Sequence, residues 1–313
     1  MSDYEIMATL WPEMPHYKYF AADSRISGIR LNTAKAEVET IDALTKQALD
    51  ESFGTPIYFD VKGRQLRVAS VEPCEDHLEL DLNHPIEVET PCVVLFKGGT
   101  DPALLVKADG KRLIFEGGPK YMVTPGDSLN IRDNSLKVHG ELFPEKQLKF
   151  IETAKRAGIT RFMLSYARNA ADVNEFRKLL GRDCEIICKI EDQQGLDFAH
   201  QAYQQQDAWN TKNLGLLHAR GDLFVELEKP HHILGATRKL IEYDPRCIVG
   251  SRILLSVTEE EVPSCADLHE IAWLLFLGYR RFMFCDGLCL NKEALNRSVN
   301  ILATIIEERR EFC

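Results

Sequence analysis

Hydrophobic residues fall into short runs along most of the chain, and stretches with helical spacing separate these runs. The runs at 5–10, 185–190 and 214–219 are largely continuous, which is typical of parallel strands buried on both faces. Segments such as 36–53 carry apolar residues three or four apart, as an amphipathic helix does. Strands alternating with helices predict an α/β fold, and a TIM (β/α)8 barrel, which typically needs ~250 residues, fits within the 313 residues.

Residues 68–143 follow a different pattern. Short runs of alternating polarity, such as 77–82 and 111–115, are separated by turns rich in glycine and proline. This pattern predicts an all-β module. We therefore expect residues 1–67 and 144–313 to form the barrel, with 68–143 inserted after its third strand as a small β-rich domain.

Two of the buried strands end in charged residues. Lys189 and Glu191 are two residues apart, so they share one side of their strand. Because the carboxyl ends of barrel strands form the active face, this pair is either a salt bridge closing the strand or part of a site for a metal and an anion. The next strand is followed by Asp222, four residues after His218. A period of two can place both on one side, where His218 is either a buried, hydrogen-bonded histidine or a general acid or base.

The composition argues against several functions. A net charge of −10 does not suit nucleic-acid binding, because such surfaces are basic. No apolar run approaches the ~20 residues of a membrane span, and the first residues do not resemble a secretion signal. The nine cysteines show neither CxxC nor Cys/His ligand spacing, so we expect a reducing, cytoplasmic location.

Several motifs resemble those of the pyruvate kinase family. KIEDQQG at 189–195 is similar to the family's KIEN-x-x-G, and ARGDLFVE at 219–226 is similar to ARGDLG-[VI]-E, although Phe224 stands where the family has glycine. The resemblance extends along the chain through RLN at 30–32, DVKGRQLR at 60–67, the PGD turn at 125–127 and RFMLSYARNAADVNEFRKLLG at 161–181. It implies a barrel with a reduced lid domain and without the family's C-terminal domain.

The resemblance also implies a set of site residues. Glu191 and Asp222 would hold Mg²⁺ or Mn²⁺, which prefer oxygen ligands, beside a small 2-oxo acid. Ser251 keeps the hydroxyl of a family threonine beside the substrate. The expected substrate-binding residues are Arg30, Asp60, Lys62, Arg67, Arg220 and Gly221, and the expected catalytic residues are Ser251, His218 and Lys189.

Other family positions have changed. In the family's SFxRK pattern, the lysine that would stabilise the phosphoryl group in flight corresponds to Asn169. Ala34 and Val61 replace a serine and a threonine that supply oxygen ligands to potassium, so K⁺ is not expected. The loop after Phe284 lacks the glutamate and lysine of the family's nucleotide loop, and Arg252 replaces a glutamine. The changed positions serve phosphoryl transfer, potassium and nucleotide more than the acid.

These observations leave three functions open. The first is a metal-dependent lyase or transferase acting on a pyruvate or phosphoenolpyruvate-type 2-oxo acid, by enolisation, aldol or retro-aldol cleavage, or decarboxylation. The second is a reduced but true pyruvate kinase that converts phosphoenolpyruvate and ADP to pyruvate and ATP. The third is a non-catalytic protein that binds the metal and the oxo acid. A homo-oligomer is compatible with each of them.

Overall fold

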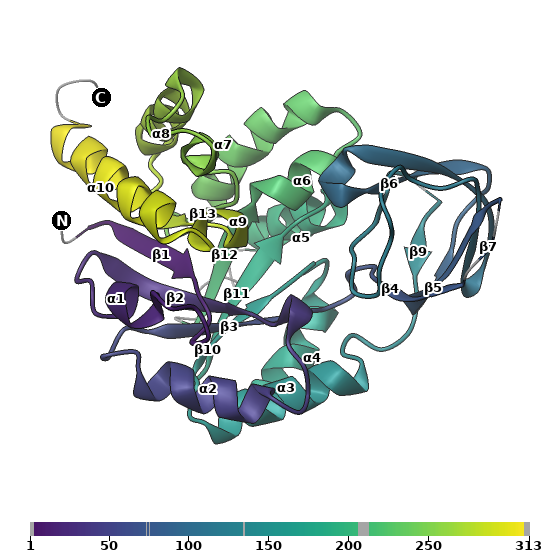
Figure 1. Ribbon diagram of the computed structural model, residues 1–313, viewed down its shortest axis with the longest axis horizontal. Coiled ribbons are helices and arrows are strands. Elements are labelled where there is room, and N and C mark those ends of the chain that lie inside the picture. Colours follow the sequence, from purple (N-terminus) through teal and green to yellow (C-terminus); the bar gives the residue numbers. More distant parts are fainter. Residues whose placement is uncertain (1–2, 73, 75, 134, 206–212, 310–313) are drawn as a thin grey trace.

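Eight parallel strands form a closed barrel, as the sequence pattern predicts (Figure 1). The computed structural model describes residues 3–309 except 73, 75, 134 and 206–212, with the side chain of residue 35 also left out. Around the barrel, strands that follow one another in the chain are neighbours, and the last pairs with the first. The strands are β1 (Glu5–Thr9), β2 (Ile26–Asn32), β3 (Ile57–Val61), β10 (Arg161–Leu164), β11 (Glu185–Ile190), β12 (Leu214–Ala219), β13 (Ile248–Gly250) and β14 (Arg281–Met283).

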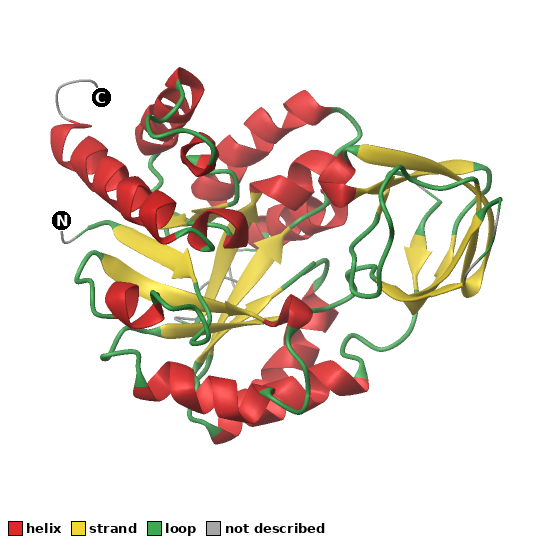
Figure 2. Ribbon diagram, viewed as in Figure 1, coloured by secondary structure: helices red, strands yellow, loops and turns green. Residues whose placement is uncertain are grey.

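Helices surround the barrel on the outside, and the main hydrophobic core lies between them and the strands (Figure 2). A smaller cluster that includes Met7, Met163 and Leu217 fills the barrel interior. The described helices are α1 (Tyr17–Ala21), α2 (Ile41–Asp50), α3 (Glu145–Arg156), α4 (Ala170–Leu180), α5 (Gln193–Gln204), α6 (Arg220–Glu226), α7 (Ile233–Tyr243), α8 (Cys265–Leu277), α9 (Asp286–Cys289) and α10 (Lys292–Glu308). No described helix is long and apolar enough to cross a membrane.

A second sheet of six strands lies between β3 and β10 in the chain and projects to one side of the barrel (Figure 1). It comprises β4 (Val68–Glu72), β5 (Leu78–Glu87), β6 (Cys92–Phe96), β7 (Asp101–Glu116), β8 (Asn130–Ile131) and β9 (Lys137–Val138). Its strands pair antiparallel and enclose a separate hydrophobic core. In β6 the burial alternates along the strand, as the period of two requires. We call this sheet and its loops the β domain.

Two predicted helix boundaries differ from the structure. The helix expected at 36–53 is only α2, because Ala36 is extended after a short 3₁₀ turn at Thr33–Lys35. The sequence pattern predicts a helix over 196–206 after β11, of which residue 206 lies outside the described residues, whereas α5 begins earlier, at Gln193. Its start is set by Asp192, whose side chain accepts a hydrogen bond from the backbone N–H of Gly195, and such caps favour helix initiation.

Candidate active site

Asp60, at the end of β3, organises the charged groups at the carboxyl ends of the barrel strands. Its Oδ2 accepts hydrogen bonds from Arg30 at 2.5 Å, from Lys62 at 2.9 Å and from Lys189 at 3.3 Å. Its Oδ1 accepts one from the Ser165 hydroxyl at 3.0 Å. Burial alone would raise the pKa of Asp60, but the three cations lower it by a larger amount. The pKa of this carboxyl is therefore held well below its usual range. One fully buried carboxylate thus gathers cations from three strand ends.

Lys189 and Glu191 share one side of the chain, as their spacing predicts. Lys189 Nζ lies 2.9 Å from Glu191 Oε1 and 2.9 Å from the Ser165 hydroxyl. The other carboxylate oxygen of Glu191 accepts the backbone N–H of Tyr166 at 2.6 Å. Burial raises the pKa of Glu191, Lys189 opposes this, and the charge of Asp222 raises it further. Both carboxylates line the same pocket.

The two carboxylates fit a hard divalent cation. Asp222 lies in the first turn of α6, is partly exposed, and lines the same pocket as Glu191. No hydrogen bond or ion pair from a described residue reaches its carboxylate. An oxygen donor set from neighbouring strand ends, with one carboxylate uncommitted, suits Mg²⁺ or Mn²⁺ better than a softer ion.

The pocket around these groups is small, and residues on the β-domain side form one of its walls. Its volume is about 170 Å³, less than the ~300 Å³ at which pockets for drug-sized ligands begin. Gln65, Arg67 and Ser128 contribute from the β-domain side. Arg67 is fixed there by hydrogen bonds to the Gln65 side chain at 2.7 Å and to the carbonyl of Gly126 at 2.6 Å. The remaining lining residues are Arg30, Asn32, Lys62, Lys189, Glu191, Leu217, Ala219, Asp222, Ser251, Met283, Cys285 and Asp286.

Asp286, which was not predicted as a site residue, is the third acidic side chain lining this pocket, after Glu191 and Asp222. It follows β14 and pairs with Arg30 at 3.1 Å, and its other oxygen accepts a hydrogen bond from Asn32 at 2.8 Å. Burial raises its pKa, but the charge of Arg30 and the bond from Asn32 bring the net pKa below its usual value. The sequence alone did not point to Asp286, because its loop lacks the family's glutamate and lysine. Only the closure of the barrel brings Asp286 next to Arg30.

Ser251 and Gly221 meet at the wall of the pocket. A Cβ placed on Gly221 would lie 3.2 Å from the Ser251 Cβ, so the first turn of α6 approaches this serine closely. Ser251 has a φ of +66°, a conformation that is uncommon for residues other than glycine and costs of order 1–3 kcal/mol. Strain of this kind is frequent at functional sites, and it agrees with the position expected for Ser251.

The structure does not bring His218 into the pocket. Its neighbours Leu217 and Ala219 face the barrel interior, so His218 faces outward, where its ring lies 6.4 Å from that of Tyr279. It is completely buried, and neither ring nitrogen has a hydrogen-bond partner. Burial lowers its pKa well below the usual value, so the ring stays neutral. The shared side assumed for His218 and Asp222 fails because β12 ends at Ala219 and Asp222 belongs to a helix.

Arg220 also points away from the pocket. Its guanidinium pairs with Glu270 of α8 and donates hydrogen bonds to the carbonyls of Gly250 and Ser251. The side chain therefore ties α6 to the loop after β13 and to α8, and it is not among the described residues that line the pocket. Gly221 and Asp222 are held in place by this anchor.

Two departures from the family pattern have local explanations. Asn169 caps α4, because its side chain accepts the N–H of Asp172, and it does not line the pocket of Glu191 and Asp222. Lys189, the lysine of the KIE motif, lies beside Glu191, so the pocket has an ammonium group whatever residue stands at 169. The second departure is a pair: the Arg252 guanidinium stacks over the Phe224 ring at 5.0 Å.

A larger cavity of about 620 Å³ lies between the β domain and the loops after β10, β11 and β12. At its edge the β domain docks on α6 through Asn130, which donates a hydrogen bond to Glu226 at 2.6 Å, and through Arg132, which donates one to the carbonyl of Val225. Burial raises the pKa of Glu226 to about 7. The described lining of this cavity does not include Glu191 or Asp222, which line the smaller pocket.

The fold and the site together define a TIM-barrel protein with a charged pocket beneath an inserted β domain. The model of the pyruvate kinase barrel domain matches residues 122–283, about half of the chain. The chain therefore belongs to the pyruvate kinase family. It is 24% identical to a pyruvate kinase of Methanocaldococcus jannaschii over 327 residues, which cover 98% of this chain and 70% of that protein.

Other relatives give the same result. Identity to a pyruvate kinase of Borreliella burgdorferi is 25% over 317 residues, covering 92% of this chain and 65% of that protein. Identity to the pyruvate kinase of Thermoplasma acidophilum is 22% over 333 residues, covering 98% and 59%. The chain thus spans between 59% and 70% of the length of these relatives.

Proposed function

We propose that the protein moves a proton at the methyl carbon of pyruvate or a closely similar 2-oxo acid, with Mg²⁺ or Mn²⁺ held by Glu191 and Asp222. The observation that carries this proposal is the ion pair between Asp286 and Arg30, because a carboxylate already occupies the arginine that would receive a phosphate. The pocket of about 170 Å³ also favours a small acid.

Each side chain has a role that follows from its contacts. Lys189, held between Asp60 and Glu191, places positive charge where the enolate oxygen develops. The backbone N–H of Gly221, at the start of α6, and the guanidinium of Arg67, which lines the pocket, would bind the carboxylate of the acid. Lys62, whose pKa is lowered to about 7 by burial and by Lys189 and Arg30, is suited to accept the methyl proton and return one from solvent. A bound divalent ion would add Lewis-acid stabilisation of the same oxygen.

Proton NMR of pyruvate in D₂O, with the protein and Mg²⁺, tests this proposal. We expect the methyl signal to disappear as deuterium replaces the protons. Asp222→Asn should slow the exchange about 10²–10³-fold, the usual cost of losing a group that stabilises transition-state charge. Asp197→Asn is the matched control, because that exposed aspartate lies outside the pocket, and it should leave the exchange rate unchanged. Tight pyruvate binding without exchange would favour the non-catalytic function instead.

A second candidate is phosphoryl transfer between phosphoenolpyruvate and ADP. It is supported by family membership and by the convergence of Arg30, Lys62 and Lys189 on one carboxylate, an arrangement of cations that suits a phosphoryl group. The distinguishing measurement is ADP-dependent formation of pyruvate from phosphoenolpyruvate. Turnover at 1–100 s⁻¹, about the range of kinases, would make this candidate the main function. Cleavage and decarboxylation of larger oxo acids remain variants of the first proposal.

We further propose that K⁺ is not required. The ammonium group of Lys62 donates a hydrogen bond to Asp60. Val61 and Ala34 have no side-chain oxygen that could bind potassium. Pyruvate exchange rates measured in potassium and in tetramethylammonium buffers should therefore agree. A homo-oligomer and a cytoplasmic location remain predictions, which light scattering of the purified protein and fractionation of cells would test.

A further inference from the structure

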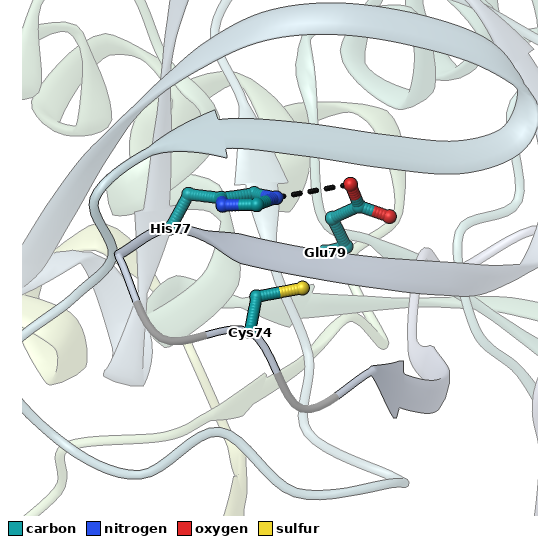
Figure 3. A group of neighbouring side chains, drawn as sticks. All are labelled: Cys74, His77 and Glu79. Atoms are coloured by element: carbon teal, nitrogen blue, oxygen red, sulfur yellow. Dashed lines mark hydrogen bonds and ion pairs between the residues drawn. The ribbon is translucent and has the colours of Figure 1, made fainter.

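A cluster of potential metal ligands lies in the β domain, away from the pocket. Cys74 and His77 lie between β4 and β5, Glu79 lies near the start of β5, and one donor atom from each is within 4.8 Å of the other two. Figure 3 shows His77 facing Glu79 on β5, with Cys74 on the neighbouring segment. The sequence did not indicate this cluster, because it contains no paired Cys/His motif. Its third donor is a carboxylate, which only the strand geometry brings close to the other two.

One hydrogen bond of His77, to Asp76, resembles that of a metal-binding histidine. Nδ1 lies 2.7 Å from Oδ1 of Asp76, while Nε2 faces Glu79 Oε1 at 3.0 Å. Histidines that bind metals usually donate the other ring N–H to a carboxylate, which fixes the ring and the tautomer. Asp76 is placed to do this for His77, and Nε2 is left facing the other two donors.

The distances are compatible with a tetrahedral ion. Bonds of about 2.0–2.3 Å place neighbouring ligand atoms roughly 3.3–3.7 Å apart, close to the 3.0 Å already present between His77 and Glu79. Cys74 is exposed, so a small side-chain rotation can bring its sulfur in. Arg112 pairs with one oxygen of Glu79, which leaves the other oxygen for the ion.

We propose that Cys74, His77 and Glu79 form a binding site for Zn²⁺ or a chemically similar ion, with water as the fourth ligand. A thiolate with an imidazole and a carboxylate selects such ions over Mg²⁺, which prefers oxygen donors alone. The site is separate from the ion proposed for Glu191 and Asp222, and it does not depend on the proposed function. Bound metal would fasten the β4–β5 turn, and through Arg112 and Glu79 it would act on the pairing of β5 with β7.

Titration of the metal-free protein with Co²⁺ tests the proposal. A thiolate bound to Co²⁺ gives an intense near-ultraviolet charge-transfer band, which the all-oxygen site cannot produce. We expect this band to appear in the wild type, to saturate at one equivalent and to be displaced by Zn²⁺. Cys74→Ser should abolish the band, and Asp76→Asn should weaken Co²⁺ binding roughly 10–100-fold, as loss of a carboxylate partner of a ligand histidine does.

Two other cysteines supply matched controls. Cys265 is exposed and lies 3.3 Å from Nδ1 of His269, so it forms a Cys–His pair on a helix without belonging to the cluster. Cys285 lines the active-site pocket. Cys265→Ser and Cys285→Ser should both leave the band unchanged. Absence of the band in the wild type, or its persistence in Cys74→Ser, would overturn the proposal. Circular dichroism of each variant verifies that it is folded.

Discussion

Arg30 and Asp286 form an ion pair of 3.1 Å between side chains that are 256 residues apart in the chain. Arg30 lies on β2 and Asp286 follows β14, and both strands neighbour β1 in the closed barrel. The pair matters because the same guanidinium also binds Asp60. With a carboxylate on either side, Arg30 has little positive charge left for an anionic ligand.

Asp286→Asn should therefore strengthen the binding of phosphorylated acids. Removing the negative charge of Asp286 leaves the positive charge of Arg30 available to the ligand. Because the Asp286 side chain is 49% exposed, solvent screens the effect, and we expect about 1 kcal/mol or a fivefold tighter affinity for phosphoenolpyruvate. Isothermal titration calorimetry with phosphoenolpyruvate and with pyruvate measures the difference. Glu293→Gln, an equal charge change at an exposed position of α10, should leave both affinities unaltered.

The rate of methyl-proton exchange should rise with pH through about 7. Lys62 has its pKa lowered to about 7 by burial and by neighbouring cations, so its amine becomes available as a base above that pH. Lys62→Arg keeps a positive charge beside Asp60, but the arginine side chain cannot lose a proton in this pH range. We expect this variant to exchange pyruvate protons roughly 10²–10⁴-fold more slowly. An unchanged rate and pH profile would show that the base is another group.

Asp60→Asn should destabilise the fold strongly. The substitution leaves Arg30, Lys62 and Lys189 without their shared buried carboxylate. Breaking a buried ion pair on one side costs about 3–5 kcal/mol, which urea denaturation measures as a loss of unfolding free energy. Asp50→Asn removes an exposed carboxylate from its pair with Lys46 and should cost less than about 0.5 kcal/mol. Similar losses in the two variants would contradict the central role of Asp60.

His218→Phe should retain activity and should not lower stability. Both nitrogens of this buried ring lack partners, and an unsatisfied buried polar group costs about 1–3 kcal/mol. A phenyl ring of similar shape removes that cost, so urea denaturation should show a gain of up to a few kcal/mol. The pyruvate exchange rate should equal that of the wild type. A large fall in exchange rate with intact stability would restore the catalytic role expected from the sequence.

The charged residues that follow strands were predictable where the strand geometry continues through them. Lys189 and Glu191 lie on one side because they are two apart on an extended segment, and the structure places them 2.9 Å from each other. The same argument failed for His218 and Asp222, because the chain turns into α6 after Ala219 and the alternation stops there. The direction of Arg220 was not predictable for a related reason: it is the first residue of that helix, and its side chain points back toward Glu270.

By itself the sequence determined the barrel, the inserted sheet and the acidic and basic residues at the strand ends, because periodicity and burial are local properties of a strand or helix. The tertiary structure decided which of these groups meet. Asp60 became the shared partner of three cations, and Asp286 reached Arg30 only because the eighth strand closes against the first. Contacts between distant segments depend on the direction of each side chain and on the closure of the sheet, and neither is encoded in any single stretch of the chain.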